Sequence, residues 1–405
     1  MKALTQSSIQ RSVICPMNRL SHQEEIYNGL VEWKLPFYFS KPVINHLTPF
    51  IDGMVSVGFT GKLTEIHSFS HQKKHRTTLS HFLKKGSWNE HYLLQQTKEH
   101  ILRKVDKQEP VFLLLDDTIC EKTKPSSQAD SPTESCGYHL SHTHGKTVWG
   151  HQVLQLMVKT RDQTYPYEFQ LFHKETTESK IKLSMEMIKR IPSFPSPVYL
   201  LCDSWFTSRS IIEAALSKGI HVIGALKTNR ILYPQGIRIQ AKEFATHIQE
   251  NETDLVTVGN ESYRVYRYEG ALNDLDHGVV LMCWNVEHPM EPKYMRCFLS
   301  TDTERTTEQI LLHYSERWSI ETYFKQVKGI VGFNGYQVRS ERAIKRFWAI
   351  VQFTYVFAMH LRKTAFNAAI QSIRKQKTSS IIEFVYHETT NGTSLEQIKK
   401  EFQVA

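Results

Sequence analysis

The sequence has 405 residues, a formal net charge of +9, and hydrophobic and charged fractions of 40% and 22%. This length exceeds one ordinary compact domain, so we expect two or three modules that share a core. The hydrophobic and charged fractions are typical of a soluble globular protein. The excess of positive charge favours a polyanionic partner, either a nucleic acid or an anionic membrane surface.

Local features argue against secretion and membrane insertion. The opening residues, MKALTQSSIQRSVIC, lack the apolar segment of a secretory signal. The most apolar run, Phe347 to Leu361, is too short to span a bilayer and contains Gln352 and His360, so it predicts a buried helix. The six cysteines are scattered and form no CxxC pair, which indicates free thiols in a reducing cytoplasm.

Residues 1–108 are predicted to be helical, with short helices over 62–68 and 76–85 and a longer helix up to Val105. Basic residues cluster in this segment, namely Lys73, Lys74, His75, Arg76, Lys84, Lys85, Arg103 and Lys104. The cluster predicts a DNA-binding module of helix-turn-helix type. The alternative is the solvated basic face of a scaffold bundle, and residue spacing alone does not separate the two.

The pattern changes near residue 110. The apolar run Val111 to Leu115 predicts a strand buried on both faces, whereas the polar residues 121–147 predict a long loop. Further strands are predicted over 152–160, 165–172, 198–202 and 221–226, helices over 179–191 and 208–218, and short alternating strands over 229–303. A long helix is predicted from Thr306 past Lys328. This order predicts an α/β fold in which helices flank a mixed sheet.

Aspartates follow two of the predicted buried strands: Asp116 and Asp117 after the first, and Asp203 after 198–202. If these strands are neighbours, their carboxylates meet at one edge of the sheet. Clustered carboxylates repel one another and ionise together only beside a compensating cation. Oxygen ligands of this kind suit Mg²⁺ or Mn²⁺. The alternative is that these aspartates merely cap turns, where Asp is common.

The predicted long helix carries Tyr314, Arg317, Glu321 and Lys328 at offsets of three, four and seven residues. At 3.6 residues per turn, these steps keep all four side chains on one narrow stripe. An adjacent apolar stripe that could pack on a sheet contains Ile320, Tyr323, Phe324 and Val327. The helix could therefore present one acid and two cations to a cleft. The alternative is a surface helix on which Arg317 and Glu321 form an ordinary i,i+4 pair.

The complete pattern Tyr-x2-Arg-x3-Glu-x6-Lys, preceded by LLLDDT and LLCDSWFTS, resembles the bacterial insertion-sequence transposases of the DDE type. The resemblance covers roughly residues 108–362. It implies a ribonuclease H-like catalytic domain with a β-rich insertion between the second and third acids. It also implies an enzyme that binds transposon ends, cleaves phosphodiester bonds and joins the ends to target DNA by two-metal phosphoryl transfer.

Under this resemblance, the catalytic acids and metal ligands are Asp117, Asp203 and Glu321, which would hold two Mg²⁺ or Mn²⁺ ions. Asp117 matches the first acid because it stands directly before Thr118, but Asp116 is a rival that could equally close the strand. Adjacent strand residues point to opposite faces, so both cannot easily reach one metal site. The remaining motif residues that would contact DNA phosphates are Tyr314, Arg317 and Lys328.

The resemblance further implies double-stranded DNA as the partner, in the form of transposon terminal repeats and target DNA, and a dimer in the DNA complex. No membrane partner is expected. We expect a bacterial cytoplasmic location, with the protein on the nucleoid when it is bound to DNA. The expected domains are a helical DNA-binding domain (1–108), a catalytic domain (109–228 and 304–364), a β insertion (229–303) and a C-terminal helical tail (365–405). The loop 121–147 has no counterpart that we can assign, and the tail is short.

Related enzymes often form a hairpin at the transposon end with a base flipped out, for which an aromatic platform is useful. Trp284 is the candidate for this platform, with Trp318 and Trp205 as alternatives, although each could instead be a core residue. A rival zinc site would use Cys136, His139, His142 and His144, but their spacing fits no zinc arrangement that we can justify. Two functional alternatives stay open: a transposase-derived DNA-binding protein, and a metal-dependent nuclease or resolvase without strand transfer.

Overall fold

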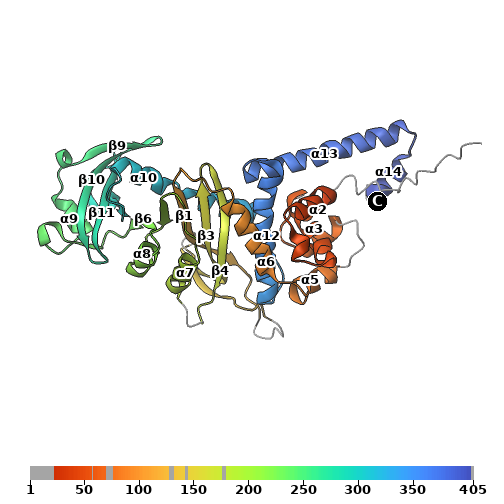
Figure 1. Cartoon of the computed structure of the whole chain (residues 1–405), viewed down its shortest axis with the longest axis horizontal. Helices are drawn as coiled ribbons and strands as arrows, with labels where there is room; N and C mark the ends of the chain where they lie inside the picture. Colours follow the sequence, from red (N-terminus) through yellow and green to blue (C-terminus); the bar gives the residue numbers. More distant parts are fainter. Residues whose placement is uncertain are drawn as a thin grey trace, which may run out of the picture. The chain divides into compact units, whose positions relative to one another are not determined.

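The structure is a computed structural model that describes residues 22–56, 58–69, 76–126, 132–141, 145–175 and 179–402 (Figure 1). The chain forms two compact units. Unit 1 takes the described residues of Met1–Leu93, Ile330–Gln337 and Arg346–Ala405, and unit 2 takes those of Leu94–Gly329 and Val338–Lys345. Compactness does not identify functional domains, so the domain limits given above stay predictions.

Unit 1 is helical, as predicted for the N-terminal segment. Its elements are α2 (Gln23–Glu32), a 3-10 turn (Leu35–Phe37), α3 (Lys41–Ser56), α4 (Leu63–Phe69), α5 (Arg76–Lys84), the start of α6 (Glu90–Leu102), most of α12 (Glu341–Arg362), α13 (Phe366–Thr390) and α14 (Leu395–Phe402). The predicted apolar helix lies within α12, where Phe347, Trp348 and Phe353 are fully buried. No helix in the described part of the chain is long and apolar enough to cross a membrane.

The core of unit 1 joins its N-terminal and C-terminal parts. Arg346 of α12 is fully buried and donates hydrogen bonds to the backbone oxygens of Phe82, Leu83 and Trp88. Its guanidinium also pairs with Glu90 at 3.1 Å. The N-terminal helices therefore pack around a helix contributed by residues beyond 340, and residues 1–108 alone lack part of this core.

Unit 2 is built on one twelve-stranded sheet. The strands are β1 (Val111–Glu121), β2 (Gly137–Ser141), β3 (Lys146–Thr160), β4 (Gln163–Phe172), β5 (Val198–Cys202), β6 (His221–Leu226), β7 (Ile231–Leu232), β8 (Ile239–Gln240), β9 (Asp254–Val258), β10 (Glu261–Leu272), β11 (Leu275–Asn285) and β12 (Arg296–Ser300). Its helices are the rest of α6, α7 (Lys180–Lys189), α8 (Arg209–Leu216), the short α9 (Ala241–Phe244), α10 (Thr307–Ser315) and α11 (Trp318–Ile330), together with the first turn of α12 and 3-10 turns at Pro234–Gly236, Ala245–His247, Glu250–Glu252 and Pro292–Tyr294.

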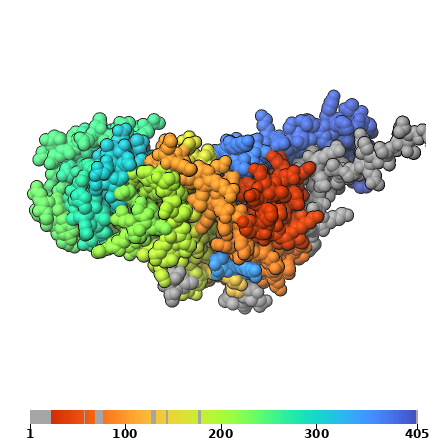
Figure 2. Space-filling view, viewed as in Figure 1, coloured from red at the N-terminus to blue at the C-terminus, as the bar shows by residue number. Residues whose placement is uncertain are grey.

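The strand order is β2-β3-β1-β5-β6-β12-β11-β10-β7-β8, with β4 on β3 and β9 on β10. Strand β1 runs antiparallel to β3 and parallel to β5, which is in turn parallel to β6. This mixed sheet with flanking helices confirms the predicted α/β class and is consistent with a ribonuclease H-like fold. The predicted β insertion extends the same sheet, because β12 pairs with β6, and its atoms continue the surface of the core in Figure 2.

The two faces of β1 meet different helices. The ring of Phe112 lies 5.0 Å from that of His313 on α10, so alternate residues from Phe112 onward face α10 and α11. The intervening residues face α7, whose Lys180 contacts Asp117. The sheet is therefore covered on both sides at the point where its aspartates lie.

Three details differ from the sequence predictions. Strand β1 continues through the aspartates to Glu121, and the predicted loop 121–147 contains β2. The predicted long helix is two helices, α10 and α11, separated by a turn at residues 316–317. In this turn Arg317 N–H bonds to Tyr314 O at 3.0 Å, and Ile320 N–H bonds to Arg317 O at 3.1 Å. These i to i+3 bonds tighten the chain locally into a 3-10-like step.

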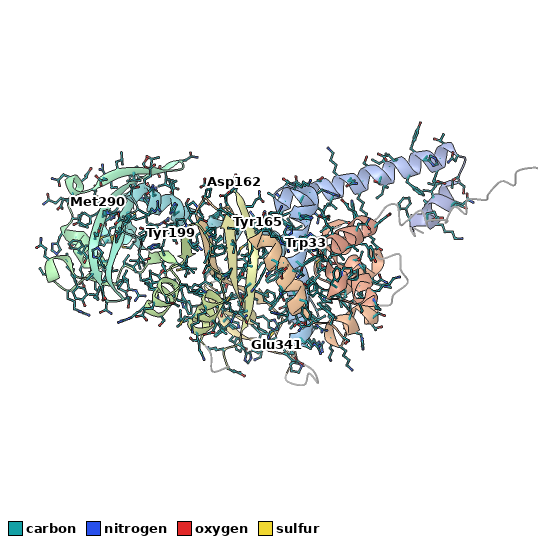
Figure 3. The ribbon with its side chains drawn as sticks, in the orientation of Figure 1. Trp33, Asp162, Tyr165, Tyr199, Met290 and Glu341 are labelled. Atoms are coloured by element: carbon teal, nitrogen blue, oxygen red, sulfur yellow. The ribbon has the colours of Figure 1, made fainter. Side chains whose placement is uncertain are left out.

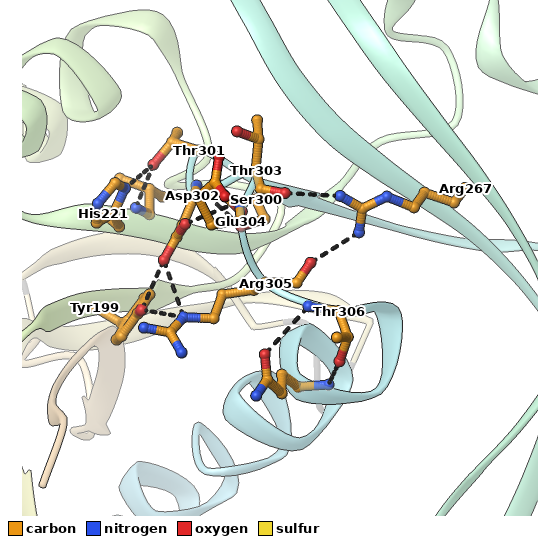
Figure 4. A network of polar contacts seen from close by, with 12 residues as sticks. Tyr199, His221, Arg267, Ser300, Thr301, Asp302, Thr303, Glu304, Arg305 and Thr306 are labelled. Atoms are coloured by element: carbon orange, nitrogen blue, oxygen red, sulfur yellow. Dashed lines mark hydrogen bonds and ion pairs between the residues drawn. The ribbon is translucent and has the colours of Figure 1, made fainter.

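A polar network fixes the start of α10 in the interior of unit 2 (Figure 4). The hydroxyl of Tyr199, a β5 residue labelled in Figure 3, donates to Asp302 at 2.7 Å and accepts from Arg305 Nε at 2.8 Å. Arg267 of β10 donates to the backbone oxygens of Thr303 and Arg305, both at 2.9 Å. The insertion thus holds the segment from which α10 and then α11 begin.

The buried Arg346 generates a stability prediction. Arg346→Met should lower the unfolding free energy by about 3–5 kcal/mol, because Glu90 loses its buried partner and three backbone oxygens lose their donor. The matched control is Arg342→Met, an exposed position on the same helix, which should change stability by less than about 0.5 kcal/mol. Thermal and denaturant unfolding of the full chain measure both. Equal stability of the two variants would contradict the role of Arg346 as the polar centre of unit 1.

Candidate active site

Asp116 and Asp203 are brought together by the pairing of β1 with β5. The parallel register places Leu115 opposite Cys202, so the residues that follow them, Asp116 and Asp203, lie at the same edge of the sheet. Burial, and then the negative charge of Asp203, raise the pKa of Asp116 to about 7. Two carboxylates therefore crowd one partly desolvated position, where a cation would be favoured.

Arg317 connects the first of these acids to the third. Its Nη1 lies 3.1 Å from Oδ2 of Asp116, and its Nη2 forms an ion pair with Oε1 of Glu321. The guanidinium side chain is mostly buried, and its carbon lies 5.9 Å from the centre of the Tyr314 ring. Asp116, Asp203, Glu321 and Arg317 thus form one charged cluster. Arg317 itself lies in the turn between α10 and α11, where the shortened step still keeps Tyr314, Arg317 and Glu321 close together.

Lys328 lies against the same face of β1. Its Nζ donates to Oγ1 of Thr118 at 2.6 Å and to the backbone oxygen of Ile119 at 3.2 Å. Thr118 is two residues beyond Asp116 and so points to the same face. Burial lowers the pKa of Lys328. All four residues of the predicted motif therefore belong to the α10–α11 side of the sheet.

Asp117 points to the opposite face of β1. Its Oδ2 accepts hydrogen bonds from Lys180 Nζ at 2.5 Å and from Gln152 Nε2 at 2.9 Å. The structure therefore groups Asp116, the rival in our sequence prediction, with Arg317 and Glu321, and it does not bring Asp117 to them. Because side chains alternate along a strand, the sequence could have predicted that Asp116 and Asp117 face opposite sides. That prediction requires β1 to continue past Leu115.

The three tryptophans proposed as an aromatic platform differ in burial. Trp284 is 0% exposed, and its indole Nε1–H donates to the backbone oxygen of Glu291 at 3.1 Å, so it serves as a core residue of the insertion. A ring without exposed surface is not available to stack on a base. Trp318, one of the alternatives, is 66% exposed and lines a cavity of about 930 Å³ together with Arg317. The other alternative, Trp205, is 38% exposed and lies in the loop that follows Asp203.

The cavity lined by Trp318 has a basic and aromatic wall. Motif residues Tyr314 and Arg317 form one side, and Phe298 of β12 contacts Tyr314 with ring centres 4.6 Å apart. Three further basic residues belong to the lining, namely Lys227, Lys242 and Arg296, together with one acid, Glu261. This composition suits a phosphate backbone with an unstacked base. Sequence reasoning missed these three cations because they are far apart along the chain.

The basic residues Lys73 and Lys74 lie outside the described residues, as does the side chain of Arg76. Their predicted contact with DNA stays a prediction. Cys136 and His139 of the rival zinc site are described, whereas His142 and His144 are not. Cys136 Sγ lies 3.4 Å from Nε2 of His151.

Across the described ranges, no three His, Cys, Asp or Glu side chains are arranged as a ready metal site. The carboxylates of Asp116, Asp203 and Glu321 nevertheless have the chemistry that Mg²⁺ or Mn²⁺ requires, because all are oxygen donors. Burial, and then the charge of Asp203, raise the pKa of Asp116, so nearby positive charge would favour its ionised, metal-binding form. In this arrangement, Arg317 supplies that positive charge to Asp116 and Glu321.

Comparison with known proteins agrees with this geometry. The family model of the transposase DDE domain matches residues 74–357, which is more than half of the chain and includes every residue of the charged cluster. A search of curated proteins finds no match. The chain therefore belongs to the transposase DDE domain family, a family of enzymes that cut and join DNA.

Proposed function

We propose that this protein is a cut-and-paste DNA transposase whose catalytic acids are Asp116, Asp203 and Glu321. The observation that carries the proposal is the Arg317 guanidinium, which pairs with Asp116 and Glu321 while Asp203 lies beside Asp116. Asp116 takes the place of Asp117 in our sequence-based assignment, because Asp117 pairs with Lys180 on the other face. Membership in the family supports the reaction class.

These acids would hold two divalent ions, which when bound would activate the nucleophile, either water or a DNA 3′-hydroxyl, and stabilise the leaving oxygen. The protein contributes position and charge. Strand β1 and the loop after β5 hold Asp116 and Asp203, and α11 carries Glu321. Arg317 has a planar fork of donors that matches a phosphate, so it is suited to clamp the scissile region of the DNA. Lys328 contributes a point charge beside Thr118.

The substrate in this proposal is double-stranded DNA, with the terminal repeats bound through the helical N-terminal segment and the target DNA at the same active site. We further propose that two copies act together on paired ends. The basic cavity next to Arg317 is suited to receive an unstacked terminal nucleotide on Trp318, which replaces Trp284 as the platform. Base–aromatic stacking contributes about 1–3 kcal/mol per base, which offsets part of the cost of unstacking a flipped base.

The acids generate the first prediction of function. Asp116→Asn, Asp203→Asn and Glu321→Gln should each abolish cleavage of labelled element ends in Mg²⁺, because each removes a carboxylate oxygen from the metal site. Asp117→Asn should keep measurable cleavage. Binding of ends should survive in all four variants, since phosphate contacts by Lys and Arg provide most of the affinity. Gel shift and cleavage assays on the same preparations measure both.

An assay with a target plasmid separates the candidate functions. A transposase gives joined product, a nuclease gives cuts alone, and a DNA-binding derivative gives shifts alone. If Asp117→Asn is inactive while Asp116→Asn cleaves normally, the first acid is Asp117 and the proposed site is wrong.

The second prediction of function concerns Arg317. If it clamps a scissile phosphate, Arg317→Ala should slow cleavage of pre-bound ends by orders of magnitude at a temperature where the variant is folded, and Arg317→Lys should recover little because Lys lacks the bidentate fork. Lys328→Arg should retain more activity, since a point charge requires less exact geometry. Single-turnover cleavage with thermal unfolding as the control tests this. Near wild-type rates for Arg317→Ala would reduce the pair with Glu321 to a structural contact.

The third prediction of function concerns Trp318. Trp318→Ala should leave the first nick at the element end intact and slow the second cleavage step, because that step needs the displaced base to be held away from the stack. Trp318→Phe should retain most of the rate, since it keeps an aromatic face. Gels that resolve nicked, hairpin and double-strand-cut ends measure the two steps. Normal processing of pre-nicked ends by Trp318→Ala would exclude this platform.

A further inference from the structure

Each of the two proposed sheet-edge acids is held by a backbone N–H of a residue close to it in sequence. Oδ1 of Asp116 accepts the N–H of Asp117 at 2.8 Å. Oδ1 of Asp203 accepts the N–H of Trp205 at 2.9 Å and that of Phe206 at 3.2 Å. The orientation of each carboxylate therefore depends on the placement of a neighbouring residue, Asp117 in one case and Trp205 in the other.

One side chain contacts both of these neighbours. Lys180, at the start of α7, places its Nζ 2.5 Å from Oδ2 of Asp117 and 3.9 Å from the centre of the Trp205 ring. Gln152 of β3 donates to the same Oδ2 at 2.9 Å. Lys180 thus lies on the face of β1 that is turned away from Glu321, and it joins β1 to the loop that follows β5.

We propose that Lys180 is a positioning residue for the DNA-cleaving reaction, because it connects the two backbone segments that hold Asp116 and Asp203. The inference rests on the proposed function, because it assumes that these two acids form the metal site. A metal ion that is coordinated by two carboxylates tolerates little variation in the distance between them. The residues that contact metal ligands commonly determine that distance. Lys180 fixes the spacing from behind, without contact with DNA or metal.

The environment of Lys180 distinguishes it from a surface ion pair. Its side chain is 15% exposed and that of Asp117 is 20% exposed, so the contact is screened little by solvent. On the same helix, Lys189 pairs with Glu186 at 2.9 Å, but its side chain is 55% exposed. An exposed pair of that kind contributes little to stability or geometry. Lys189 therefore serves as the matched control.

Lysine suits this position because a compact ammonium can meet a carboxylate and a ring face at once. Lys180→Met keeps the aliphatic stem and removes the charge, and so loses both contacts. Lys180→Arg keeps the charge and can reach both partners with a larger head group. Asp117→Asn keeps the backbone N–H that holds Asp116 but weakens the attachment to Lys180.

The test uses the full chain and two independent readouts: Mn²⁺ binding measured by electron paramagnetic resonance, and single-turnover cleavage of pre-bound ends. Lys180→Met should weaken Mn²⁺ binding and slow cleavage by roughly tenfold or more, the usual effect of removing a group that supports metal ligands. Lys180→Arg should recover most of both, and Lys189→Met should match the wild type. The double variant Lys180→Met/Asp117→Asn should bind Mn²⁺ and cleave no less well than the more impaired single variant, because both substitutions affect the same ion pair.

Unchanged Mn²⁺ affinity in folded Lys180→Met, whether or not its melting temperature falls, would overturn the inference and leave Lys180 a structural residue. If Lys180→Met does not fold, Asp117→Asn tests the same inference, because it removes the charge that Lys180 pairs with, and unchanged Mn²⁺ affinity in that variant would overturn the inference. Failure of the proposed function gives a different result. In that case Asp116→Asn and Asp203→Asn would themselves bind Mn²⁺ and cleave normally.

Discussion

Electrostatic repulsion between carboxylates that share one sheet edge is the main physical constraint on the charged cluster of unit 2. The parallel pairing of β1 with β5 places Asp116 beside Asp203, and burial, followed by the negative charge of Asp203, raises the pKa of Asp116 to about 7. Positive charge nearby favours the ionised form of both carboxylates. Arg317 provides that charge and at the same time engages Glu321 on α11. Through this shared contact, Glu321 belongs to the same charged cluster as Asp116 and Asp203.

The side chains of β1 alternate between two helical layers. Asp116 and Thr118 face the side of α10 and α11, where they contact Arg317 and Lys328. Asp117 faces α7, where Lys180 also holds the loop after Asp203. The insertion contributes from a third direction, because Arg267 fixes the residues that precede α10. A site that aligns acids from distant parts of the chain needs such support, since small displacements of a catalytic group are costly.

The sequence predicted those parts of the fold that local patterns specify. Strands 198–202 and 221–226 have the predicted limits, because short apolar runs between turn residues define buried strands well. The extent of β1 was missed, since its second half is mostly polar and pairs with β3, whereas the pairing with β5 ends at Leu115. The break at 316–317 has no Gly or Pro to mark it, and the burial of Trp284 depends on packing within the insertion. For the same reason Lys180 carried no local signal, because its partners lie on other elements.

The most direct measurement of the central claim is anomalous diffraction from crystals of the protein bound to an element end in Mn²⁺. A manganese peak coordinated by carboxylate oxygens of Asp116 and Asp203, with Asp117 still paired to Lys180 behind the strand, is the predicted result. The guanidinium of Arg317 should then lie on a DNA phosphate. Manganese coordinated by Asp117, with Asp116 turned away from the metal, would contradict the account.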